Sequence, residues 1–350
     1  MRPSVRAIGL IAVWIGASSF CGAANAQDSL IIRATPLPVF DRAVPDNRFG
    51  PLTYLGGLSL SSSHSDFEAL SGLDMAGDRM LMVTDEGHWV TATLEANETG
   101  VPLGLANAMI GPLLGGDGNP LGGKATGDAE GLALIGDAVW VTAERNQPIR
   151  TYALENGSLE GAATLPLGAE TPLQGRRNAG IEAIVHMERG PLRGETLIFL
   201  EKPPRSASAA TAMRLLPNGQ RVPFAVQRRD DFAITGAAAL PDGDVLLLER
   251  RFSWDDGIFM RLRLLRASEI ASGAVQGRRL LHADGGSVID NMEGVATTEH
   301  PDGPIITLVS DDNGNFFQRT VLLRFQINGS LDQLTASTPP APVARPASLR

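Results

Sequence analysis

Three glutamates at equivalent positions of repeated segments are the residues of this sequence best suited to carry chemistry. Glu130, Glu182 and Glu293 each precede a glycine or alanine and then an apolar run. Carboxylates that are brought together repel one another, and their pKa values rise unless a cation lies among them. A hard cation with oxygen ligands relieves that repulsion, and calcium is the cation we expect. The predicted metal ligands are Glu130, Glu182, Glu293 and Asp311.

Acids and bases near the ends of apolar strands supply the other groups that hydrolysis needs. A second acid would act as general base, and an arginine or lysine would stabilise developing negative charge. The candidate catalytic residues are Asp85, Glu86, Glu144, Arg145, Lys202 and Arg250. Adjacent residues of a strand face opposite sides, so a pair such as Glu249-Arg250 should supply one pocket residue and one surface residue.

The glutamates belong to a unit that recurs five times. Each unit has a short first strand and an apolar second strand that ends on an acid. The equivalent positions are Ser71, Glu130, Glu182, Thr235 and Glu293, with spacings of 59, 52, 53 and 58 residues. A period of about 50 residues is typical of solenoids, propellers and arrays.

Two further apolar stretches accompany each unit. The predicted third strands are Trp89–Leu94, Ile149–Leu154, Ala212–Leu216, Phe259–Leu265 and Val321–Ile327. A fourth stretch precedes each unit, as at Leu52–Leu60, Ala163–Leu167 and Arg279–Leu281. Four short strands per repeat, joined by Gly, Pro and Asp-Gly turns, indicate a propeller blade. We therefore predict an all-β fold, a single β-propeller with five or six blades of four antiparallel strands; a sixth blade would lie in residues 28–58 or 95–127.

The innermost strands of a propeller meet at its axis, which gives the repeat a functional and a structural interpretation. If the first strand of the unit is innermost, the three glutamates reach one rim, with Ser71 and Thr235 completing the ring. Alternatively, the polar residue bonds the backbone of the neighbouring blade. The sequence leaves both interpretations open.

The two ends of the chain differ from its centre. Residues 1–26 have a basic start, an apolar run and a small-x-small end, which predicts a secretory signal cleaved before Gln27 and a periplasmic or secreted protein. Residues 27–49 are expected to hold an edge strand, Leu30–Ala34, that helps to close the ring. The propeller domain is predicted at 50–330, and the Pro/Ala-rich segment 331–350 is predicted to be disordered.

Charge and motifs exclude several classes of protein. The formal net charge of −9 argues against nucleic acid and anionic membranes as partners. The sequence has no Gly-x-Ser-x-Gly elbow and no His-Glu-x-x-His zinc motif. Gly118–Lys124 has the glycine and lysine spacing of a phosphate loop, but Ala125 replaces the required hydroxyl residue.

Taken together, the motifs resemble those of the bacterial phytase-like family, also described as the esterase-like activity of phytase family. The matching segments are Ser71–Asp74, Thr84–Gly87, Asp128–Leu132, Asn178–Ala183, Asn291–Val295 and Ser310–Asn313. The resemblance covers about residues 50–328. It implies a β-propeller, export from the cytoplasm, and an activity named after calcium-dependent phytases and esterases.

The sequence therefore favours an exported, metal-dependent hydrolase that acts as a monomer on a small-molecule ester. Phosphomonoesters and carboxylic esters or lactones remain open as substrates, because calcium-dependent propeller lactonases also place carboxylates around an axial ion. The alternative is a non-catalytic periplasmic propeller that binds a ligand or a protein, with the glutamates holding blades or a structural ion. A propeller with a quinone-type cofactor is a third possibility, for which the sequence has no dedicated motif.

Overall fold

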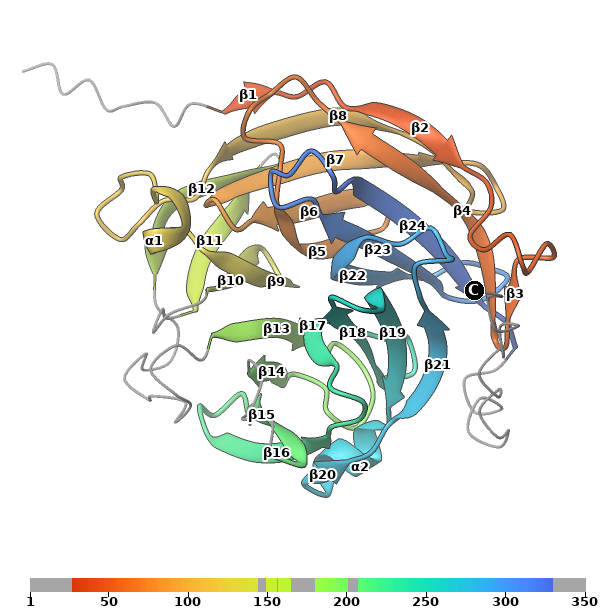
Figure 1. The fold of residues 1–350 in the computed structure, drawn as a ribbon. Helices are drawn as coiled ribbons and strands as arrows, with labels where there is room; N and C mark the ends of the chain where they lie inside the picture. The colour runs from red at the N-terminus through yellow and green to blue at the C-terminus, as the bar shows by residue number, and fades with distance from the viewer. Residues whose placement is uncertain (1–26, 144–148, 156, 165–179, 201–206, 330–350) are drawn as a thin grey trace, which may run out of the picture.

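The computed structural model describes residues 27–143, 149–155, 157–164, 180–200 and 207–329. These residues form five mainly antiparallel sheets that surround a central axis (Figure 1). The prediction of an all-β propeller is confirmed, and within the described ranges the number of blades is five.

Each blade adds its strands from the axis outward in chain order. Blade 1 contains β5 (Leu70–Ala76), β6 (Arg79–Thr84), β7 (His88–Ala96) and β8 (Pro102–Pro112). Blade 2 contains β9 (Ala129–Ile135), β10 (Ala138–Ala143), β11 (Arg150–Glu155) and β12 (Ser158–Thr164). Blade 3 contains β13 (Ile181–His186), β14 (Thr196–Leu200), β15 (Ala209–Leu215) and β16 (Arg221–Gln227). Blade 4 contains β17 (Ala233–Ala239), β18 (Val245–Ser253), β19 (Gly257–Leu265) and β21 (Arg278–Ala283).

Blade 5 joins the two ends of the chain. Its first three strands are β22 (Asn291–Thr298), β23 (Ile305–Asp311) and β24 (Thr320–Ile327), and its fourth is β4 (Leu52–Ser61). Antiparallel pairing of β24 with β4 therefore closes the ring. The fourth apolar stretch that precedes each unit in the sequence is thus the outer strand of the preceding blade, and for the first unit this is blade 5.

The N-terminal segment lies outside the closing strand. β2 (Arg33–Leu37) and β3 (Arg48–Phe49) both pair with β4, whereas β1 (Asp28–Ser29) pairs with β8 of blade 1. The expected edge strand Leu30–Ala34 is thus displaced toward β2. It does not itself make the closing contact, because β4 already occupies the exposed edge of β24. The segment links the first and last blades on their outer side.

The insertion after blade 1 is more ordered than its composition predicted. β8 occupies its first half as a regular outer strand, and the short helix α1 (Gly123–Thr126) follows a turn. The region therefore completes blade 1 and holds no sixth blade. The other helix, α2 (Ala267–Ala271), leads into β20 (Ala274–Val275), which pairs in parallel with β16 of blade 3.

Five apolar clusters fill the spaces between neighbouring blades, one for each pair. The cluster between blades 4 and 5 contains Phe40, Met292 and Phe325, all fully buried. The cluster between blades 2 and 3 contains Ala133, Ile184 and Ile198. Burial of these side chains is the main favourable contribution to folding, because both faces of each sheet leave water.

A ring of small residues lets the five innermost strands approach one another at the axis. Its members are Gly72, Gly131, Ala183, Gly236 and Gly294. A Cβ atom on Gly236 would lie 2.6 Å from the carbonyl oxygen of Glu293 in the next blade. A Cβ atom on Gly294 would lie 2.8 Å from the Cβ of Leu73. A larger side chain at these positions would force the inner strands apart.

We expect Gly236→Ala to lower the free energy of unfolding by about 1–3 kcal/mol, because the added methyl group meets backbone of the next blade. Urea unfolding followed by circular dichroism measures this change. Gly285→Ala is the matched control, since a Cβ atom there would meet nothing within 4 Å. Equal stability of the two variants would contradict the close approach of the inner strands.

Candidate functional site

A β-bulge directs the repeated polar residue of every blade toward the axis. In each inner strand the pairing register with the second strand shifts at this residue. The affected residues are Ser71, Glu130, Glu182, Thr235 and Glu293, and all five line one narrow axial channel. Bulges redirect side chains and are common beside active sites. The predicted convergence of the three glutamates is therefore present in the structure.

Two members of the ring hold neighbouring blades together. The hydroxyl of Ser71 donates a hydrogen bond to the carbonyl of Ala129 in blade 2. The hydroxyl of Thr235 donates to the carbonyl of Met292 in blade 5, over 3.0 Å. For these two residues the structural interpretation is correct. The three glutamates are partly buried in the same ring, and the space left between the five strands is about 10 Å³, close to the volume of one water molecule.

Glu293 belongs to a hydrogen-bonded network at the mouth of the channel. The side-chain amide of Asn291 donates to Glu293 over 2.9 Å and to Asp311 over 2.9 Å. Arg250 of blade 4 donates to the amide oxygen of Asn291, and its guanidinium lies 3.3 Å from Glu293. Two carboxylates therefore share one arginine and one amide, which leaves the network negatively charged.

The acids of this network are held in a protonation-sensitive environment. Burial raises the pKa of Glu293 to about 8; Arg250 opposes the shift, whereas the charges of Asp311, Glu182 and Asp85 add to it. Burial likewise raises the pKa of Asp311 to about 6, and nearby Asp85 adds to that rise. A bound cation would remove these penalties.

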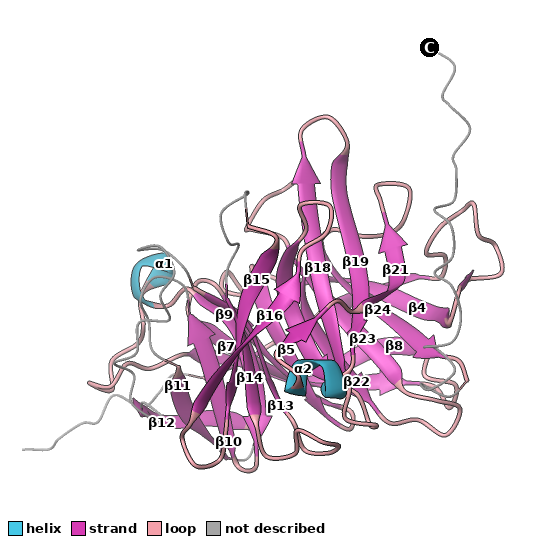
Figure 2. Ribbon diagram, turned by 90° about the horizontal axis from the view of Figure 1, so that it is seen from below, coloured by secondary structure: helices cyan, strands magenta, loops and turns pink. Residues whose placement is uncertain are grey.

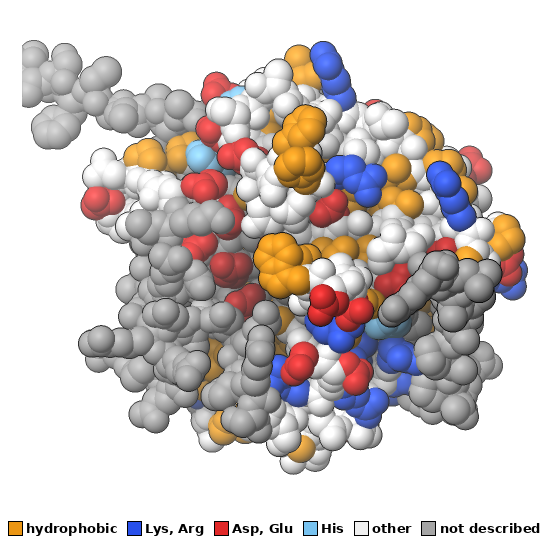
Figure 3. Space-filling model, in the orientation of Figure 1, with side chains coloured by type: hydrophobic (Ala, Val, Ile, Leu, Met, Phe, Trp, Pro, Cys, Tyr) orange, Lys and Arg blue, Asp and Glu red, His pale blue; other side chains and the backbone are white. Residues whose placement is uncertain are grey.

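Further acids extend the negative region beyond the channel. Asp85 is 7% exposed at the end of β6, and Glu86 follows it. Burial raises the pKa of Glu68, and Asp312 and Glu86 raise it further through their charge. Figure 3 shows acidic side chains gathered beside the centre of the face that is viewed in Figure 1. We call this region, formed by Glu68, Asp85, Glu86, Glu182, Glu293, Asp311 and Asp312, the acidic mouth.

Other predicted site residues have different outcomes. Glu144, Arg145 and Lys202 lie outside the described residues. Arg250 does face the axis, as described above. Its neighbour Glu249 was expected to face the surface, but it is 2% exposed and accepts hydrogen bonds from Arg261 over 2.6 Å and Arg263 over 2.7 Å. Alternation along β18 turns Glu249 into the blade, where two arginines compensate its charge.

The sequence interpretation missed the bridging role of Asn291 and the acid Glu68. Asn291 stands two residues before Glu293, so the same bulged strand presents both side chains to Asp311. A polar residue repeated at this distance from the glutamate would have been the available signal. Glu68 precedes β5 in a segment without strand character, and the sequence offers no comparable signal for it.

The donor atoms of the acidic mouth fit a hard cation better than their present arrangement does. Carboxylate and amide oxygens are the ligands that calcium prefers. Among the described residues, however, no three His, Cys, Asp or Glu side chains are grouped so that they enclose an ion. Binding would require Glu293 to move from Arg250 toward its neighbours.

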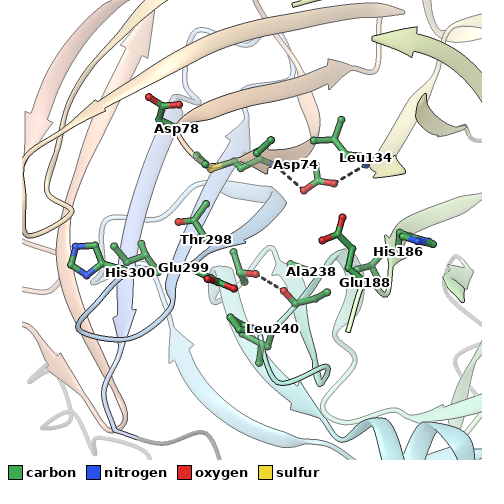
Figure 4. A pocket seen from close by; sticks show the side chains of 18 of the residues that line it. Asp74, Asp78, Leu134, His186, Glu188, Ala238, Leu240, Thr298, Glu299 and His300 are labelled. Atoms are coloured by element: carbon green, nitrogen blue, oxygen red, sulfur yellow. Dashed lines mark hydrogen bonds between the residues drawn. The ribbon is translucent and has the colours of Figure 1, made fainter. Parts of the chain in front are cut away.

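The opposite end of the channel opens into a wider pocket of about 700 Å³ (Figure 4). It is lined by the ends of the inner strands and the turns that follow them, and Asp74, Glu188 and Glu299 lie around it (Figure 4). Glu299 pairs with Arg189. The residues predicted to do chemistry lie at the other end, so we place the candidate active site at the acidic mouth despite its smaller volume.

Asp74 links two blades at the wide end. It accepts hydrogen bonds from the backbone N–H groups of Met75 over 2.7 Å and of Leu134, in blade 2, over 2.8 Å. Burial raises the pKa of Asp74 to about 6, although both backbone donors oppose this shift. The folded state therefore binds a proton at Asp74 more tightly than the unfolded chain does.

The contribution of Asp74 to the free energy of unfolding should fall as pH rises from 4 to 7, by about 1–2 kcal/mol, because its folded pKa lies above its unfolded pKa. Urea unfolding at several pH values should show that the difference between the native protein and Asp74→Asn shrinks by this amount over that range. Asp78→Asn, at an exposed position in the same pocket, is the control. A constant difference for Asp74→Asn would contradict the raised pKa.

No helix of the described residues is long and apolar enough to cross a membrane.

Comparisons with known proteins agree with the propeller fold. A gluconolactonase from Xanthomonas campestris is 14% identical, with a TM-score of 0.41, and the match covers 84% of this chain and 97% of that one. A PQQ-bound aldose sugar dehydrogenase from Streptomyces coelicolor is 12% identical, with a TM-score of 0.40, covering 87% of this chain and 99% of that one. These likenesses are too distant to indicate an activity, and a comparison with curated proteins gave no match.

The family comparison covers most of the propeller. The profile of the phytase-like family, described as the esterase-like activity of phytase, matches residues 65–314. This range begins before β5 and ends in the loop after β23, so it includes all five inner strands and the acidic mouth. The chain belongs to the phytase-like family.

Proposed function

We propose that this protein is an exported, metal-dependent hydrolase of esters whose active site is the acidic mouth. The observation that carries the proposal is the convergence of Glu182, Glu293 and Asp311 at one end of the axial channel, where burial and mutual repulsion raise the pKa values of Glu293 and Asp311. Membership of the phytase-like family supports an ester as substrate. Phosphomonoesters and carboxylic esters or lactones both remain within the proposal.

Glu130, Glu182, Glu293 and Asp311 would hold a calcium ion between them. When bound, calcium supplies Lewis-acid polarisation of the ester oxygen. The ion's charge would lower the pKa of Glu293 and release its need for Arg250.

Residues around the ion would bind and activate the reactants. Arg250, once separated from Glu293, would donate hydrogen bonds to the oxygen that gains negative charge. Asp85 or Glu86 would accept the proton of the attacking water. Glu144, Arg145 and Lys202 are further candidates for these two roles, since they follow the second strands of blades 2 and 3.

A ligand-binding propeller without turnover is the second candidate. It is favoured by the existing pairing of Arg250 with Glu293 and by the bonds of Ser71 and Thr235 to neighbouring blades. In that case the acidic mouth would hold a structural ion or a cationic partner. Turnover separates the two functions.

Calcium should raise the melting temperature of the mature chain after chelator treatment, because a ligand that binds only the folded state stabilises it. At a concentration 100 times its Kd the gain is about 2.7 kcal/mol. Differential scanning calorimetry should show this rise in the native protein and in Glu95→Gln, an exposed control, but not in Glu182→Gln or Glu293→Gln. An equal rise in all four proteins would place the ion elsewhere.

Hydrolysis of an ester panel should require the same cation. We expect Glu182→Gln and Arg250→Gln to lower kcat/KM at least 100-fold, since each removes a charge that stabilises the transition state. Proton release at constant pH measures turnover of phosphomonoesters, carboxylic esters and lactones alike. Absence of turnover across the panel with calcium bound would favour the ligand-binding propeller.

A further inference from the structure

Four of the most exposed aromatic side chains of the described residues lie on two loops beside the acidic mouth. Trp254 is 94% exposed, Phe316 is 95% exposed and Phe317 is 89% exposed, while Phe252 is 56% exposed. The rings form two pairs: Phe252 with Trp254, centroids 5.2 Å apart, and Phe316 with Phe317, centroids 5.8 Å apart. Large apolar groups that remain in water in this way commonly mark a binding site.

Both loops rise directly from residues of the acidic mouth. Each connects the second and third strands of its blade, β18 to β19 in blade 4 and β23 to β24 in blade 5. The first loop begins soon after Arg250, and the second begins at Asp311. The β18–β19 hairpin projects well beyond the neighbouring strands (Figure 2). The two ring pairs, which we call the aromatic rim, therefore stand on adjacent blades on the same face as the acidic mouth.

Specific contacts hold both loops in place. The carboxylate of Asp312 accepts hydrogen bonds from the backbone of Ala69, over 2.9 Å, and from the hydroxyl of Thr320, over 2.7 Å. In the other loop, the guanidinium of Arg251 stacks on Phe259, 4.2 Å from the ring centroid, and lies 3.9 Å from Asp256. The rings are thus presented on supported loops, which lowers the entropic cost of binding a ligand.

The charges around the rim select against a polyanionic ligand. Glu68, Asp85 and Glu86 face the same mouth, and their mutual repulsion already raises the pKa of Glu68 beyond the effect of burial. Nearby arginines are engaged with acids: Arg250 with Glu293, Arg251 with Asp256, and Arg319 with Asp290. A ligand with several phosphates would meet more negative than positive charge here.

We propose that the aromatic rim binds the uncharged aromatic or long apolar portion of a carboxylic ester substrate and so sets its specificity. This inference rests on the proposed ester hydrolase and narrows its substrate class. Phe252, Trp254, Phe316 and Phe317 position the substrate, and they take no part in bond cleavage. The ester group then lies toward Arg250 and the predicted ion.

Binding can be tested without turnover by titrating the calcium-loaded protein with N-ethyl-3-phenylpropanamide, an uncharged amide analogue of an ester. Trp254 is exposed, whereas Trp89 is 2% exposed, so an analogue at the rim should change the fluorescence of Trp254. Calorimetric Kd values should rise about three- to tenfold in Trp254→Ala and in the Phe316→Ala/Phe317→Ala double variant. Leu103→Ala, which removes a 60% exposed apolar side chain from β8, is the matched control and should leave Kd unchanged.

Specificity is then measured by the hydrolysis of ethyl 3-phenylpropanoate and ethyl acetate. Loss of the rings should raise KM for the phenylpropanoate by the same factor, with kcat and the KM for acetate unchanged. Identical Kd values in all variants, or binding of the rim to phosphatidylcholine vesicles in place of the soluble analogue, would overturn the inference. Binding that depends on the rings, in a protein that hydrolyses no ester, would keep the ligand site but overturn both its role in specificity and the proposed hydrolase.

Discussion

The close approach of five inner strands at one axis is the constraint on which the rest of the structure depends. Five blades leave a ring so narrow that backbone meets backbone: the Cα of Gly131 lies 3.1 Å from where a Cβ of Gly72 would be. Each inner strand therefore carries glycine or alanine at this level and a bulge immediately before it. The bulge turns one polar side chain per blade toward the axis. Close packing and the polar ring are two consequences of one backbone arrangement.

That arrangement also explains why carboxylates accumulate where their charge is costly. Glu293 and Asp311 are shielded from water by neighbouring blades, and Arg250 with Asn291 compensates only part of their charge. An uncompensated buried carboxylate destabilises a fold, so its presence indicates a role that the folded chain alone does not fulfil. Ser71 and Thr235 meet the same geometric demand without charge, by bonding the next blade. The contrast between these two solutions is the clearest reason to regard the glutamates as functional.

Repetition made the fold and the axial ring predictable, because equivalent positions in a propeller must meet at the axis. Five copies of a small residue after a polar one were enough to identify the inner strands. What the sequence does not encode as a repeat was harder to predict. Ring closure by β4 depends on pairing between residues about 270 positions apart, as in the register of Leu58 with Leu322. The inward turn of Glu249 toward Arg261 and Arg263 depends on strand phase, which a one-residue shift would reverse.

The two ends of the channel are chemically separate, and this decides where a substrate can react. Immediately beyond the polar ring the inner strands place Leu73, Leu132, Ile184 and Val295 around the axis. With about 10 Å³ of free space, this apolar level gives no passage to an ester or its products. A substrate that reaches the glutamates must therefore enter and leave by the acidic mouth, past the loops that join second and third strands. Because those loops carry the aromatic rings of blades 4 and 5, selection of the substrate and access to the reacting groups occur at the same place.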